Sequence, residues 1–206
     1  MIRGIRIYVE GGGKGKDSKG LVQKGFRAFF KSAADLARGK QIHFDVIACG
    51  SINSTLEDFN IALQTHKDAF NVLLVDSDGP VRVGPREHLR ARGGLKLRGS
   101  VVDESCHLMV QTVEAWLIAD VAALKQFYGQ EFSASAIPGN TNVEEINKAN
   151  LYSSLKAATR RTQKGQYHKV IHGAELLKKV DVAQVRNRAP HCDRLFATIQ
   201  RKISAR

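Results

Sequence analysis

The sequence predicts an α/β protein with a mostly parallel four-stranded sheet flanked by helices and followed by a helical C-terminal extension. Three observations predict this class. Short apolar runs with strand-like composition recur between residues 5 and 111. Segments long enough to be crossover helices separate the first three of these runs. Acidic residues directly follow several runs, as is typical where parallel strands end at a ligand site.

Each element has its own justification. The first expected strand, residues 5–9, is rich in β-branched side chains, and residues 42–48 alternate at first between apolar and polar. Residues 21–37 carry apolar side chains at helical spacing, and Gly39 is a typical helix end. The other expected elements are a helix over 55–70, strands over 72–75 and 106–111, a helix over 112–120 with Thr112 as N-cap, and C-terminal helices over 143–148, 150–162, 169–180 and 190–203.

The length of 206 residues fits one domain or a domain with an appendage, and 43% hydrophobic residues are enough for a core. A loop over residues 129–142 separates an expected domain over 1–128 from a basic helical extension over 129–206 packed on it. No segment has the length of a membrane span, and the N-terminus lacks the shape of a signal peptide. The three cysteines form no CxxC pair, so we expect a reducing cytoplasm and neither structural zinc nor disulfides.

The formal charge of +12 is unevenly distributed along the chain. Positive charge gathers in residues 1–40, 82–98 and 151–206, whereas residues 41–81 and 99–150 carry an acidic excess. A polyanion that approaches carboxylates needs cations around it, so this pattern favours a nucleic-acid partner, DNA or RNA. A solvated basic surface without a partner is the alternative.

Asp76 and Asp78 directly follow the most apolar of the expected strands, residues 72–75. Alternation along an extended backbone would put both side chains on one side. Two carboxylates that close repel each other, and a divalent cation between them is a common remedy. Oxygen-only ligands suit Mg²⁺ or Mn²⁺.

Two glutamates occupy comparable places. Glu10 follows the first strand, so it can share a site with Asp76 and Asp78 at the carboxyl edge of a parallel sheet. Glu114 follows the strand over 106–111 and could supply a further metal oxygen or act as a base through water. Its alternative role is to complement the dipole of the helix in which it lies. The predicted catalytic residues are therefore Glu10, Asp76, Asp78 and Glu114, with the first three as metal ligands.

Basic residues flank these carboxylates in the sequence. Lys14 and Lys16 lie in a glycine-rich loop after Glu10 whose spacing does not fit a Walker phosphate loop. Contacts of these lysines with nucleic-acid phosphates are the expected role, and a plain surface loop is the alternative. Arg82 and Arg86 follow the acidic pair and are candidate phosphate ligands, or else part of an exposed basic segment.

The ordered acidic motifs resemble the Toprim domain of topoisomerases, bacterial primases and nucleases of the overcoming-lysogenization-defect type. The motifs are Val9-Glu10-Gly11 and Val75-Asp76-Ser77-Asp78. More narrowly, nearly the whole chain resembles the Toprim-like domain of unknown function numbered 4276. Further matching segments are residues 110–120, residues 164–169, His172-Gly173 and residues 188–192. A glycine–lysine loop after Glu10 is a departure from many Toprim proteins and bears on whether a second metal site is complete.

This resemblance implies a Toprim-like fold and a metal-dependent nuclease controlled by an ATPase of the ABC or AAA type, as an effector of bacterial defence against phage. Two further interpretations remain. One is a non-catalytic nucleic-acid-binding or regulatory subunit that keeps the acidic elements of the fold. The other is primase chemistry, although the chain lacks the accessory domains that primases usually carry.

Overall fold

The computed structural model describes residues 2–13, 15–95, 97–99 and 101–205 of the chain. Its centre is a four-stranded sheet made of β1 (Gly4–Glu10), β2 (His43–Gly50), β3 (Ala69–Asp76) and β4 (Cys106–Met109). The strand order is β2-β1-β3-β4, and every neighbouring pair is parallel. The predicted α/β class with a parallel four-stranded sheet is therefore confirmed.

The register of the sheet separates two apolar faces. Ile5 pairs with both Phe44 and Phe70, and Ile7 pairs with both Val46 and Val72. Because side chains alternate along a strand, residues such as Ile5 and Ile7 bury on one face while Tyr8 buries on the other. The core therefore consists of two clusters, one on each side of the sheet.

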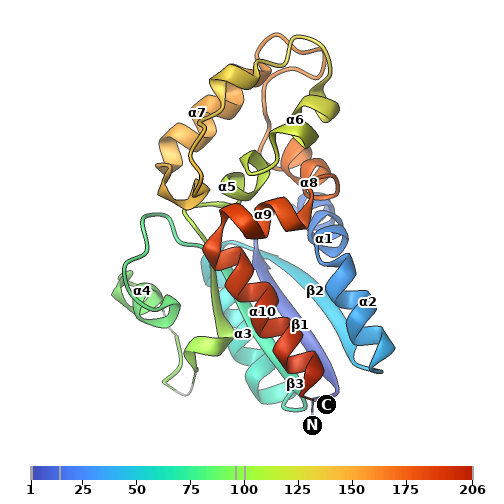
Figure 1. Cartoon of the computed structure of the whole chain (residues 1–206). Helices are drawn as coiled ribbons and strands as arrows, with labels where there is room; N and C mark the ends of the chain where they lie inside the picture. The colour runs from blue at the N-terminus through green and yellow to red at the C-terminus, as the bar shows by residue number, and fades with distance from the viewer. Residues whose placement is uncertain (1, 14, 96, 100, 206) are drawn as a thin grey trace.

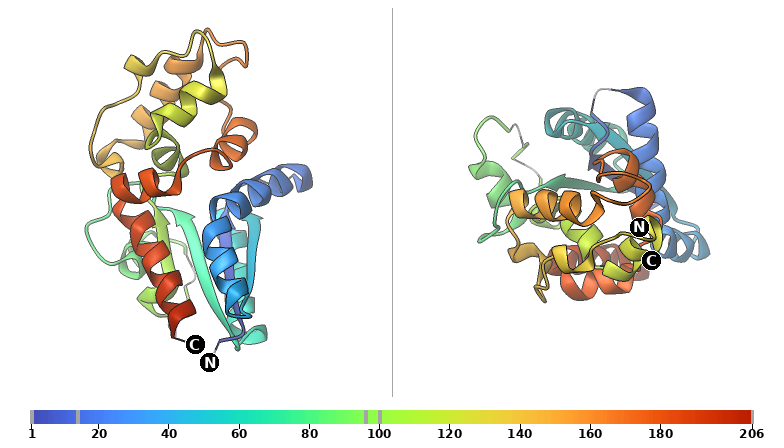
Figure 2. Two further views of the ribbon diagram at one scale, coloured as in Figure 1. Left: turned by 45° about the vertical axis from the view of Figure 1, so that its right-hand side comes forward. Right: turned by 90° about the horizontal axis from the view of Figure 1, so that it is seen from above.

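Helices cover both faces. The larger cluster joins the sheet to α1 (Lys16–Phe29), α2 (Lys31–Gly39) and α10 (Pro190–Ser204). The smaller cluster joins it to α3 (Ile52–Thr65) and α4 (Pro85–Ala91). Figure 2 shows α10 lying along the sheet, with both chain termini close together at one end. The C-terminal helix thus completes a layer over the sheet.

A helical lobe lies beyond the carboxyl ends of the strands, at the top of Figure 1. It contains α5 (Val113–Ile118), α6 (Val121–Tyr128), α7 (Lys148–Thr159) and α8 (Ile171–Leu177), and α9 (Val182–Arg188) leads from it into α10. Short 3₁₀ segments lie at η1 (Asp103–Ser105), η2 (Ala134–Ala136) and η3 (Val143–Glu145). Among the described helices, none is long and apolar enough to cross a membrane.

Aromatic side chains connect the N-terminal and C-terminal parts of the chain. Phe29 stacks on Trp116 with ring centroids 5.2 Å apart, and Phe196 meets Phe29 edge-on at 5.7 Å. A single buried cluster runs from Ile5 to Ile203. The boundary drawn at residues 128 and 129 stays a prediction, but the segment after it shares the core of the segment before it.

Several element bounds differ from the sequence-based expectation. The helix expected over 21–37 is two helices, α1 and α2, that meet at Phe30. The helix expected over 55–70 ends at Thr65, and β3 begins at Ala69 because the first residues of β1 pair with it. The buried Asn71 side chain donates hydrogen bonds to the carbonyls of His66 and Ala69 at this junction. Tertiary pairing therefore overrides the helical pattern there.

Shorter differences follow from local geometry. The strand expected over 106–111 ends at Met109, and the helix expected over 112–120 ends at Ile118. Residues 143–145 form a 3₁₀ turn within the helix expected over 143–148. Thr112 is the N-cap residue of α5 as expected, but its hydroxyl makes no capping hydrogen bond.

Candidate active site at the carboxyl edge of the sheet

Glu10 and Asp76 lie side by side because β1 and β3 are neighbouring parallel strands that end at the same edge. The backbone N–H of Asp76 donates to Glu10 Oε2 at 3.1 Å. Asp76 is 5% exposed, and its Oδ1 accepts a hydrogen bond from the N–H of Val113 at 3.1 Å. The sheet thus brings together two of the predicted ligands although they are 66 residues apart in the sequence.

Burial of this pair makes its negative charge costly. Desolvation, followed by the charge of Asp76, raises the pKa of Glu10 to about 7. Desolvation likewise raises the pKa of Asp76 to about 6, although the nearby Lys169 opposes the rise. Strongly perturbed carboxyls that share a pocket are typical of functional sites.

Glu114 joins the pair from α5, where only 3% of it is exposed. Its Oε1 accepts a hydrogen bond from the Tyr167 hydroxyl at 3.0 Å, and its Oε2 accepts one from the Thr112 hydroxyl at 2.6 Å. Lys169 Nζ lies 3.4 Å from Asp76 Oδ2 and 3.9 Å from Glu114 Oε2. The predicted Glu114 therefore belongs to the same carboxylate cluster, which consists of Glu10, Asp76 and Glu114.

The side chain of Asp78 does not join this cluster but pairs with other residues. The strand ends at Asp76, and Asp78 adopts a left-handed backbone with φ of 58°, so alternation no longer aligns the two side chains. Its carboxylate forms ion pairs with Arg92 and Lys148. Partial burial would raise the pKa of Asp78, but the hydrogen bonds and charges of Lys148 and Arg92 hold it below its usual range.

The predicted trio Glu10, Asp76 and Asp78 is accordingly not assembled around one point. Among the residues that the structure describes, no group of three or more His, Cys, Asp or Glu side chains is arranged to hold a metal ion. The donor chemistry nevertheless fits Mg²⁺ or Mn²⁺, since the oxygens are carboxylates and a cation would relieve the mutual repulsion of the buried pair.

The pocket that contains the pair has a volume of about 290 Å³. Its lining includes the charged residues Glu10, Asp76 and Lys169 beside several apolar side chains. Both sides of the sheet edge contribute: the glycine loop after β1, the turn after β2, and α8 of the helical lobe. The other lining residues are Gly11, Gly12, Gly13, Val22, Phe26, Gly50, Ser51, Val113, Val170, Gly173, Ala174 and Leu177.

The glycine loop follows the wall of this pocket closely. Gly12 has φ of +88°, and a Cβ at this position would lie 2.7 Å from Lys19 Cα. Gly50 has φ of +100°, and a Cβ there would lie 2.4 Å from the carbonyl oxygen of Gly13. Only glycine fits such close backbone contact with positive φ.

The four residues predicted to contact nucleic acid differ in their surroundings. Lys14 lies outside the described residues. Lys16 is exposed as the first residue of α1, and Arg82 is exposed in the loop after Asp78. The Arg86 guanidinium instead donates to the carbonyl of Gly99 at 2.9 Å, so this side chain holds a loop of its own chain.

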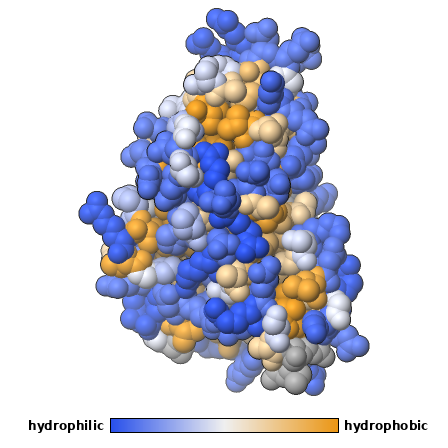
Figure 3. Space-filling view, viewed as in Figure 1, coloured by the Kyte–Doolittle hydropathy of each residue, from blue (hydrophilic) through white to orange (hydrophobic). Residues whose placement is uncertain are grey.

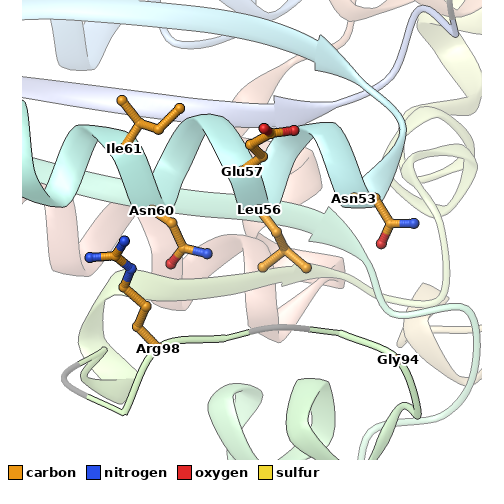
Figure 4. A pocket seen from close by; sticks show the side chains of 7 residues that line it. All are labelled: Asn53, Leu56, Glu57, Asn60, Ile61, Gly94 and Arg98. Atoms are coloured by element: carbon orange, nitrogen blue, oxygen red, sulfur yellow. The ribbon is translucent and has the colours of Figure 1, made fainter.

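A second and larger pocket, of about 640 Å³, lies away from the carboxylate cluster (Figure 4). It lies between α3 and the segment that carries Gly94 and Arg98, and contains none of the predicted site residues. The carboxylate pocket is therefore the one that the sequence-based prediction concerns.

Sequence reasoning missed four residues that contact the acidic groups. Lys169 and Tyr167 come from the irregular segment before α8. Arg92 lies within the basic stretch that the sequence marks as a candidate phosphate ligand, and Lys148 begins α7. Lys169 is 93 residues from Asp76, and no spacing rule connects them.

Of the comparisons with known proteins, one gives a match, to a protein family. No curated protein and no solved structure matches the chain. A family's sequence model does match, over residues 9–200, which includes Glu10, Asp76, Glu114 and Lys169. The chain belongs to that family, described as a domain of unknown function (DUF4276).

Proposed function

We propose that this protein is a metal-dependent nuclease that hydrolyses phosphodiester bonds of DNA or RNA. The observation that carries the proposal is the carboxylate cluster Glu10, Asp76 and Glu114 at the carboxyl edge of a parallel sheet beside a pocket, with Asp76 and Glu114 buried and Glu10 partly buried. Parallel α/β sheets bind their ligands at this edge. Buried carboxylates that repel each other are suited to a divalent cation.

In this proposal Glu10 and Asp76 hold Mg²⁺ or Mn²⁺, with Asp78 or Glu114 as a further ligand. The bound ion would polarise the phosphate and lower the pKa of a water molecule. Tyr167 and Thr112 orient Glu114 through the two hydrogen bonds that its oxygens accept. An oriented carboxylate is in a position to receive a proton from water.

The basic residues near the carboxylates would bind the phosphates of the nucleic acid. The chain carries a formal charge of +12, and both Lys16, the first residue of α1, and Arg82, in the loop after Asp78, are exposed. Figure 3 shows that the face seen in Figure 1 is mostly hydrophilic, with smaller apolar areas. Cations around a carboxylate site would lower the repulsion that a nucleic acid meets on approach. Lys14, two residues before Lys16 in the sequence, belongs to this set as a proposal from the sequence.

The acidic motifs also support a finer proposal. Glu10 at the end of β1 and Asp76-Ser77-Asp78 at the end of β3 resemble the Toprim motifs of overcoming-lysogenization-defect nucleases, primases and topoisomerases. On that resemblance we propose a cytoplasmic effector of antiphage defence that an ABC-type or AAA-type ATPase controls. Association with such an ATPase in a pull-down from cells that express both genes would support this part.

The direct test compares nuclease activity of Asp76→Asn with that of the wild type, in Mg²⁺ and in Mn²⁺. Loss of at least ~100-fold is expected, because removal of a group that acts in the transition state costs several kcal/mol. Asp68→Asn is the matched control, since Asp68 is exposed at the opposite end of β3. A folded Asp76→Asn protein that cleaves as fast as the wild type would refute the proposal.

A non-catalytic nucleic-acid-binding or regulatory subunit is the second candidate. The observation in its favour is that ion pairs with Lys169, Lys148 and Arg92 neutralise Asp76, Glu114 and Asp78 within the protein itself. This candidate predicts salt-sensitive binding of nucleic acid without metal-dependent turnover. Turnover in purified protein that disappears in Asp76→Asn excludes it.

A further inference from the structure

We propose that Lys169 is an internal cation that closes the carboxylate cluster, and that a divalent metal ion must displace its ammonium group to bind. This inference rests on the proposed metal site and names how that site is regulated. The displaced ammonium would then lie at the mouth of the pocket and contact a phosphate of the substrate. The site would thus have two arrangements: in one the Lys169 ammonium lies on the carboxylates, and in the other the metal ion does.

The first support is that Lys169 occupies the space between the buried carboxylates. Its Nζ lies 3.4 Å from Asp76 Oδ2 and 3.9 Å from Glu114 Oε2. The other oxygens of these two groups accept hydrogen bonds from Val113 N–H and the Tyr167 hydroxyl. Glu114 Oε2 also accepts a hydrogen bond from the Thr112 hydroxyl, so each of the four oxygens has a partner already. A metal ion at Asp76 Oδ2 would take the place next to this oxygen that the Lys169 ammonium now occupies.

The second support is electrostatic. Asp76 and Glu114 are almost fully buried, and the ammonium group of Lys169 faces both of their carboxylates. A divalent ion at the same carboxylates would meet this positive charge at a few ångströms in a partly desolvated pocket, where repulsion is strong.

The third support is that Lys169 can move without disturbing the fold. It lies in a turn before α8, and its side chain is 48% exposed, whereas Asp76 and Glu114 are held by buried strand and helix backbone. It lines the same pocket as Glu10 and Val170. A long, partly solvated lysine side chain changes rotamer easily, so the ammonium can leave the carboxylates while α8 stays in place.

The test measures Mn²⁺ and Mg²⁺ binding to the full chain by calorimetry. Lys169→Met is expected to bind either ion at least tenfold more tightly than the wild type, about 1.4 kcal/mol. Lys169→Arg, which keeps the charge, is expected to stay near the wild-type affinity. Lys179→Met is the matched control, because it removes an exposed lysine close by in the sequence and is expected to change affinity less than twofold.

A second readout follows the position of Lys169. The rate at which an amine-acylating reagent modifies the Lys169 side chain, read by peptide mass spectrometry, is expected to rise in the wild type when Mn²⁺ is added, because the ammonium leaves its carboxylate partners. The inference is overturned if Lys169→Met and Lys179→Met bind with equal affinity, or if Mn²⁺ slows the modification of Lys169. If neither the wild type nor Lys169→Met binds metal, the proposed metal site itself fails, and the inference with it.

Discussion

Glu10 and Asp76 are carboxyls that the folded protein keeps partly protonated near neutral pH. Their pKa values rise from 4.5 to about 7 and from 3.8 to about 6, chiefly because both are desolvated. A carboxyl whose pKa is higher in the folded than in the unfolded state binds more protons when folded. Stability from such a group is therefore greatest at low pH and declines as pH rises through the window between the two pKa values.

This linkage gives a prediction for Glu10→Gln in the presence of a chelator. From about pH 5 to about pH 7.5, the unfolding free energy of the wild type should fall relative to that of the variant, by on the order of 1–3 kcal/mol. Urea unfolding of both proteins at several pH values measures this difference. The comparison with the variant cancels opposing groups such as the buried His107, whose pKa is lowered to about 3 by desolvation. If the unfolding free energies of the two proteins changed with pH in the same way, this result would contradict the raised pKa of Glu10.

Asp78 illustrates where residue-level reasoning from the sequence stops. Alternation was a sound argument for Asp76 because that residue still lies in β3. It failed for Asp78 because the backbone turns to positive φ there and the side chain finds Arg92 and Lys148. A turn geometry two residues beyond a strand leaves no periodic signal in the sequence.

At the scale of elements, the parallel sheet positions the site, and the pattern of apolar runs was sufficient to predict that sheet. The strands β1, β3 and β4 end at one edge, so Glu10, Asp76 and the start of α5 with Glu114 come together. The segment with Lys169 could not be predicted as a part of the site, because it is irregular and contacts the edge only through the packing of the helical lobe.

The glycine loop between β1 and α1 provides an element-level prediction. Gly12→Ala should destabilise the protein by about 2 kcal/mol or more, because Ala disfavours φ of +88° and its Cβ would lie 2.7 Å from Lys19 Cα. Gly13→Ala is the matched control, since its φ is also positive, at +56°, but a Cβ there has no atom within 4 Å. Thermal unfolding of both variants decides the point, and equal losses would show that close contact at Gly12 has no effect of its own.

At the scale of the whole molecule, the C-terminal third of the chain has two roles. α10 covers the sheet through a core that includes Phe29, Trp116 and Phe196, while the segment before α8 places Tyr167 and Lys169 on the carboxylates. The sequence indicated the helices of this region and its basic surface, but the long-range contacts that tie it to Asp76 and Glu114 are a property of the tertiary fold.

The central claim is that the buried carboxylates form a metal site, and calorimetric titration of the wild type and Asp76→Asn with Mn²⁺ tests it most directly. We expect the wild type to bind the ion and the folded variant to lose at least ~100-fold in affinity, because Asp76 is hydrogen-bonded to Glu10 and shares the Lys169 ammonium with Glu114. Equal binding by both proteins, or no binding by the wild type and by Lys169→Met, would contradict the account.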